Sequence, residues 1–113
     1  MATDAREPRL DVSRQEEETV VRFIGCTSLN EYTADKVGRQ LLAVADGRPG
    51  QRVTLDLAPV EYLTSTVLSH LVRLHKRLLA VGGQLTLANP QPVVRDVFRV
   101  TLLDQVLHIL PAA

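Results

Sequence analysis

Apolar residues along this chain alternate between two spacings, and this alternation constrains the fold more than any other feature. Stretches in which every second residue is apolar predict strands, whereas apolar residues at every third or fourth position predict helices. After an initial pair of strands, helix-like and strand-like stretches follow one another along the chain. Such an order favours a sheet with parallel pairings and with helices packed against it. We therefore expect an α/β fold with a mixed sheet of four to five strands and about three helices.

The first half of the pattern predicts a hairpin and one helix. Residues 10–13 and 19–24 are expected to be strands, joined by the charged segment 14–18. Its glutamates are interpreted as a solvent-exposed loop rather than a metal site. The helix that follows is predicted from four apolar residues on one face: Ala34, Val37, Leu41 and Val44. Glycine and proline within residues 46–50 then end this helix.

The second half predicts two further helices between strands. Residues 53–57 and 84–88 are expected to be strands, and residues 105–110 either a short final strand or a segment that caps the core. The helix between the first two carries a stripe of apolar residues: Val67, Leu68, Leu71, Leu74, Leu78 and Val81. Gly82 and Gly83 are expected to end it, as glycines commonly do. The last helix is expected to start near Pro92 and to face the core through Val93, Val94, Val97 and Phe98.

Length and charge restrict the class of protein. A chain of 113 residues has the size of one domain, and its hydrophobic fraction of 45% supports one core. We expect a polar lead-in over residues 1–9 and one folded domain over residues 10–113. Thirteen basic residues balance thirteen acidic ones, which argues against nucleic-acid binding, since contacts to phosphates need a basic excess.

We also expect no segment that directs the chain into a membrane. No apolar run approaches the roughly 20 residues that cross a bilayer, and the polar N-terminus lacks the apolar stretch of a signal peptide. The single cysteine, Cys26, fits a reducing compartment and is interpreted as a small apolar filler near a strand end. We therefore expect a cytoplasmic protein that does not insert into membranes.

Residues that usually carry catalysis or bind metals form no recognisable pattern. His70 and His75 lie five positions apart on one predicted helix, which places them about 140° apart around its axis. They do not face one ion, and we interpret them as surface histidines. The sequence contains no glycine-rich phosphate loop and no nucleophile turn. We therefore expect no enzymatic activity, no metal and no cofactor.

Three hydroxyl residues, Thr64, Ser65 and Thr66, stand directly before an amphipathic helix. Such residues commonly cap a helix by accepting hydrogen bonds from the free N–H groups of its first turn. A helix N-terminus also favours a phosphate, because its N–H donors and dipole attract negative charge. The cluster is therefore consistent with a helix cap and with a phosphorylation switch.

The order of these features resembles the STAS domain of bacterial anti-sigma factor antagonists. Residues 53–89 carry the resemblance as VTLDLAPVEYLTSTVLSHLVRLHKRLLAVGGQLTLAN, and residues 92–109 as PVVRDVFRVTLLDQVLHI. A weaker match lies in VVRFIGCTSLN at residues 20–30. A strand with LDL, a hydroxyl-bearing loop, a helix ending in GG and a strand ending in LAN follow in the family's order. The resemblance covers nearly all of the chain after residue 9 and implies that residues 10–113 form a STAS domain.

The resemblance implies a regulator that acts by binding another protein. In the family the loop reads D-S-S/T-G/A-L, and a partner serine kinase phosphorylates the first serine after the aspartate, a position that Ser65 occupies here. The unphosphorylated domain binds this kinase, which is also the anti-sigma factor, and so frees the sigma factor. The chain departs from the pattern at Thr64, which replaces Asp, at Val67, which replaces Gly or Ala, and at Ser28, which replaces the Asp of an earlier strand turn.

We expect the partner to dock on the Ser65 loop and on the outer face of the helix that follows it. The expected contact residues are Thr64, Ser65, Thr66, Val67, His70, Arg73 and Arg77. An alternative is a constitutive STAS adaptor subunit without a phosphorylation switch, for example on a lipid-transport ABC permease or in a sensory assembly. Phosphoserine in the native protein favours the regulator, and copurification with a membrane permease favours the adaptor.

Overall fold

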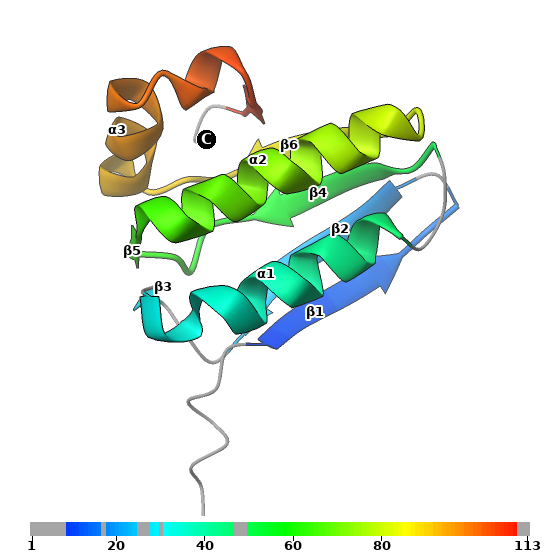
Figure 1. Ribbon diagram of the computed structural model, residues 1–113, viewed down its shortest axis with the longest axis horizontal. Coiled ribbons are helices and arrows are strands. Elements are labelled where there is room, and N and C mark those ends of the chain that lie inside the picture. The colour runs from blue at the N-terminus through cyan, green and yellow to red at the C-terminus, as the bar shows by residue number, and fades with distance from the viewer. Residues whose placement is uncertain (1–8, 17, 25–27, 30, 47–49, 111–113) are drawn as a thin grey trace, which may run out of the picture.

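The strands and helices form a five-stranded sheet with two long helices lying side by side on one of its faces (Figure 1). The computed structural model describes residues 9–16, 18–24, 28–29, 31–46 and 50–110. The elements along the chain are β1 (Arg9–Arg14), β2 (Glu18–Ile24), β3 (Ser28–Leu29), α1 (Glu31–Ala45), β4 (Arg52–Asp56), β5 (Tyr62–Leu63), α2 (Ser65–Ala80), β6 (Gln84–Ala88), α3 (Pro92–Val100), η2 (Leu103–Gln105) and β7 (His108–Ile109).

The sheet is mixed, with the strand order β1-β2-β4-β6-β7. β1 and β2 form the antiparallel hairpin that the sequence predicts, and all other neighbours in this sheet run parallel. A parallel neighbour needs a crossover connection, and α1 and α2 provide the crossovers from β2 to β4 and from β4 to β6. The prediction of a mixed sheet of four to five strands with about three helices is therefore confirmed.

The core lies between the sheet and the helix pair. Five of the six residues predicted as an apolar stripe on α2 are buried: Val67, Leu68, Leu71, Leu74 and Leu78. From α1, Val37, Leu41 and Val44 are buried against them, as expected. Alternation along β4 contributes Val53 and Leu55 to the same layer.

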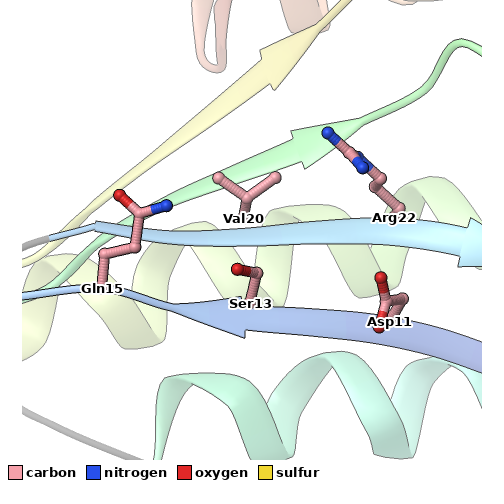
Figure 2. Close-up of a pocket in the computed structure, with 5 residues that line it drawn as sticks. All are labelled: Asp11, Ser13, Gln15, Val20 and Arg22. Atoms are coloured by element: carbon pink, nitrogen blue, oxygen red, sulfur yellow. The ribbon is translucent and has the colours of Figure 1, made fainter.

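The other face of the sheet is polar, and no described helix crosses it over β1 and β2 (Figure 2). Sheets with parallel strands are usually covered by helices on both faces. This face is exposed to water, and the polar side chains at its outward positions make that exposure favourable. On this face the guanidinium of Arg22 lies 3.6 Å from the carboxylate of Asp56. The Thr54 hydroxyl donates a 2.9 Å hydrogen bond to the carboxylate of Glu18. Glu18, interpreted above as part of a loop, therefore belongs to β2 and to this polar face.

The end of α2 depends on glycine in the way the sequence predicts. Gly82 has a φ of +79°, a left-handed conformation that favours glycine, and a Cβ on Gly83 would lie 2.5 Å from the Gln51 carbonyl oxygen. The Gly83 N–H donates to the Leu78 carbonyl at 2.7 Å. Val81 follows the last helical residue and is 42% exposed, so its assignment to the buried stripe was wrong.

Two other differences from the sequence predictions concern short or amphipathic segments. β5 was not predicted, because a two-residue strand shows no periodicity; it pairs in parallel with β3 in a separate ribbon. Val93 was expected in the core but is 62% exposed, while Val94 and Phe98 of the same helix are buried. The lead-in over residues 1–9, except for the start of β1, and Cys26 lie outside the described residues.

Candidate functional site

The candidate site lies at the N-terminus of α2, where the parallel strands of the sheet end. β4 and β6 run toward this end of the molecule, and both α1 and α2 begin there (Figure 1). The short ribbon of β3 and β5 lies beside it, and β5 also packs against α3. Both long helices therefore direct the positive ends of their dipoles toward this end.

The three hydroxyl residues have different positions at the helix start. Thr64 is the N-cap residue, with extended backbone, but its side chain makes no capping hydrogen bond and its Oγ1 is buried without a partner. Ser65 is the first helical residue, and it is exposed. Of the three residues expected to provide a helix cap, Thr64 therefore holds the cap position and Ser65 does not. The exposed hydroxyl of Ser65 is open to another protein.

From Ser65 an exposed polar stripe, which we call the α2 outer stripe, runs along the helix. Its residues follow at steps of three and four and are Ser65, Ser69, Arg73 and Lys76. The Ser69 hydroxyl donates to the carbonyl of Ser65 at 3.2 Å, which occupies it within the helix. Arg77 is also exposed and lies 3.5 Å from the carboxylate of Asp46 in the chain segment after α1. Because α2 contains no acidic residue, its charged surface is entirely basic.

Two of the expected contact residues lie away from this surface. Val67 is completely buried, since it belongs to the apolar stripe that faces the core, and it is not available to a docking partner. His70 is half-buried, and both of its ring nitrogens are buried without a hydrogen-bond partner. A Cβ on Gly38 of α1 would lie 2.6 Å from the His70 ring, so the ring packs directly on the α1 backbone. The interpretation of His70 as a surface histidine is therefore wrong.

Three exposed residues of this surface were not predicted as contacts. Tyr62 of β5 is 53% exposed, and aromatic residues of this kind often anchor protein interfaces. Ser69 and Lys76 complete the α2 outer stripe between and beyond the predicted residues. The spacing of four residues from Ser65 would have indicated Ser69, whereas the exposure of Tyr62 depends on the unpredicted strand β5.

Two hollows that are lined entirely by described residues are small. A hollow of about 110 Å³ on the outer sheet face is lined by Asp11, Ser13, Gln15, Val20 and Arg22 (Figure 2). Another, of about 280 Å³, lies between β1 and α1. Both are smaller than typical ligand pockets, and neither is lined by residues of the α2 outer stripe. Within the described residues no cluster of His, Cys, Asp or Glu has the arrangement of a metal site.

The described helices also include none that is both long and apolar enough to span a membrane. The candidate site is thus an exposed hydroxyl at a helix start, next to a basic helix face and an exposed tyrosine. Such a surface suits contact with a macromolecule better than enclosure of a substrate.

The family model of the STAS domain matches residues 9–112, and the chain belongs to this family. A curated relative is BtrV of Bordetella bronchiseptica, which carries the name of an anti-sigma factor antagonist. The two sequences are 33% identical over 85 residues, which cover 75% of this chain and 70% of BtrV.

Solved structures confirm the fold. An anti-sigma factor antagonist (STAS) domain protein from Planctomyces limnophilus superposes with a TM-score of 0.84 at 26% identity, covering 92% of this chain and 91% of that one. SpoIIAA of Bacillus in its phosphorylated form gives a TM-score of 0.66 at 18% identity, covering 91% and 92% of the two chains. At that identity the likeness to SpoIIAA concerns the fold alone.

Proposed function

We propose that this protein is an anti-sigma factor antagonist that acts by binding an anti-sigma factor and is released when Ser65 is phosphorylated. The observation that carries the proposal is the exposed Ser65 at the first position of α2 in a STAS domain. The names of BtrV and of the Planctomyces protein support the antagonist role. The protein works through association, without catalysis, cofactor or metal.

A phosphate on Ser65 is compatible with the folded domain. It adds about −1.5 to −2 charges at neutral pH. Near the N-terminus of α2 this charge is favourable by roughly 0.3–1 kcal/mol, because the helix dipole and free N–H groups attract it. No acidic residue in the first turn of the helix repels it. Modification therefore changes the surface charge without unfolding the chain.

The same phosphate is costly within an interface. A partner that covers Ser65 must either desolvate the added charge or match it with its own basic groups. The docking surface in this proposal consists of Thr64, Ser65, Thr66, Tyr62 and the rest of the α2 outer stripe, with Arg77 beside it. Val67 and the ring nitrogens of His70 take no part because they are buried.

The modification is tested on protein isolated from its native cells. Tandem mass spectrometry should place phosphate on Ser65 and none on Ser69, the nearest exposed serine of the same helix. Ser65→Ala should remove the modification, and Ser69→Ala should not. Because Ser65 does not cap the helix, Ser65→Ala should lower the free energy of unfolding by less than about 0.5 kcal/mol. Native protein that carries no phosphate under any growth condition contradicts the switch.

The effect on binding is tested with the natural partner. The wild-type chain captures this partner from native lysate, and the partner is then purified. Isothermal titration should show that phosphorylated protein and Ser65→Asp bind it at least about tenfold more weakly than wild type, because the added charge must be desolvated. Ser65→Ala should bind like wild type. Val100→Asp is the charge control and should also bind like wild type, because Val100 is 77% exposed on α3 and lies outside the proposed docking surface. If all forms bind equally well, the chain is a constitutive adaptor.

A further inference from the structure

Among the described residues, β1 is the one long strand of the sheet that has no neighbour on its outer side. β1 has six residues and pairs on one side only, with β2, whereas the strand at the opposite edge, β7, has two residues. The β1–β2 register is continuous from Arg9 to Arg14, so no bulge interrupts this edge. No proline lies within the strand either. β1 therefore lacks two of the devices that protect edge strands, a bulge and a proline, and its protection rests on charged side chains such as Asp11 and Arg14.

The hydrogen-bond pattern shows which backbone groups the edge offers. The Gln15 N–H donates to the Glu18 carbonyl at 2.8 Å, which makes residues 15 and 18 a hydrogen-bonded pair at the hairpin end. Bonded and non-bonded pairs alternate along antiparallel strands. Asp11 and Ser13 therefore direct their backbone groups toward β2. Leu10, Val12 and Arg14 direct their N–H and C=O groups toward the open edge.

The side chains of these same three residues point into a groove. Leu10, Val12 and Arg14 line the hollow of about 280 Å³ between β1 and α1, together with Gln40, Ala43 and Val44. Val12 is 37% exposed there, although it sits in the middle of a strand. The free backbone groups and an incompletely covered apolar groove thus coincide at one edge.

We propose that a second copy of this chain pairs with β1 in antiparallel orientation, which joins the two sheets across a two-fold axis at Val12. In this register Val12 lies opposite its own copy, and Leu10 lies opposite the second copy's Arg14. Each of these pairs exchanges two backbone hydrogen bonds, so that all outward groups of Leu10, Val12 and Arg14 are satisfied. The aliphatic part of the second copy's Arg14 covers Leu10 in the groove.

The outer face of the strand fits the same register. Asp11 and Ser13 follow one another on the face turned away from the helices (Figure 2). Pairing about Val12 places Asp11 opposite the second copy's Ser13, whose hydroxyl is a donor for the carboxylate. The complementarity is reciprocal, because the axis relates the two pairs.

Neighbouring registers are less favourable. A two-fold axis at Asp11 places two carboxylates directly opposite each other, which is destabilising. An axis at Ser13 places Leu10 opposite residue 16, beyond the end of β1. The chain has a formal net charge of zero, so long-range repulsion between copies does not oppose association. Since two short strands bury little surface, the dimer is expected to be weak and reversible.

Sedimentation equilibrium across a micromolar to millimolar concentration series measures the association. The wild-type mass should rise from 12.5 kDa toward twice this value as the concentration increases. Val12→Pro removes an N–H that points away from β2, so the monomer should keep its fold, which circular dichroism checks. The substitution should weaken self-association at least about tenfold, since the central bonds are lost. Val12→Thr keeps the N–H and should still dimerise.

Two further measurements identify the surface. Amide hydrogen exchange of Leu10, Val12 and Arg14 should slow with rising concentration, while exchange of Asp11 and Ser13 should not change. Val12→Lys should abolish the dimer, and Val100→Lys is the control, because Val100 is 77% exposed on α3. A chain that stays monomeric at every concentration overturns the proposal, as does a dimer that Val100→Lys disrupts and Val12→Pro leaves intact.

Discussion

Two buried polar residues link the sheet to the C-terminal end of α1, at the end of the molecule opposite the candidate site. Thr19 of β2 and Gln51, just before β4, are the described polar residues that are almost fully buried. The Thr19 hydroxyl donates to the Gln51 side-chain oxygen at 2.6 Å, and the Gln51 amide donates to the Val44 carbonyl at 2.9 Å. This chain of bonds links two strands to the end of a helix, and burial makes each of its groups costly to leave unpaired.

Thr19→Val tests this buried pair. The substitution keeps the side-chain shape but leaves the Gln51 oxygen without its donor, and the free energy of unfolding should fall by about 1–3 kcal/mol. Thr86→Val, on the half-exposed outer face of β6, is the matched control and should change it by less than about 0.5 kcal/mol. Urea denaturation measures both. Equal values for the two variants would show that the buried hydrogen bond contributes nothing.

At the scale of elements, α2 has two functions on opposite faces. Its apolar stripe fixes the helix to the sheet and to α1, and its outer stripe presents Ser65 and basic residues to solvent. Burial of the apolar face holds the helix in place, so the hydroxyl at its start has a fixed position relative to the sheet. The helix is therefore both a core element and the proposed docking element.

Leu74→Ala and Leu79→Ala separate the two faces. Leu74 is completely buried and Leu79 is 54% exposed on the same helix, so the change in helix propensity is the same for both. Leu74→Ala should lower the free energy of unfolding by about 2–5 kcal/mol, and Leu79→Ala by less than about 1 kcal/mol. Thermal and chemical denaturation provide the comparison. Similar losses at both positions would contradict the orientation of α2.

At the scale of the whole molecule, the balance of charges governs behaviour in solution. Acidic and basic residues are equal in number, and the isoelectric point of the sequence is about 6.8. A protein with a net charge near zero repels its own copies weakly. Phosphorylation shifts this balance toward negative charge by about −1.5 to −2.

Solubility should therefore be lowest near pH 7 and rise in both directions, because protonation at lower pH and deprotonation at higher pH restore net charge. Precipitation by polyethylene glycol across a pH series measures this. Protein phosphorylated on Ser65 should have its minimum at a lower pH, since additional protons are needed to balance the phosphate. A minimum at the same pH in both forms would contradict this prediction.

Periodicity along the chain was enough to predict the order of the long elements and the layer to which most of their residues belong. Periodicity reports which side of an element is apolar, and in α2 and β4 that side became the core. The same information located the hydroxyl cluster at a helix start. These are local properties, because each depends on residues a few positions apart.

Which segment covers each side of an element depends on how distant parts of the chain pack together. Val93 has the apolar character of a core residue and remains exposed, while His70 packs on Gly38 because α1 lies against α2. β3 and β5 exist as a pair, although neither two-residue strand has a recognisable pattern. The open edge of β1 likewise follows from the strand order. Each of these features depends on contacts between segments far apart in the sequence, which periodicity along the chain does not contain.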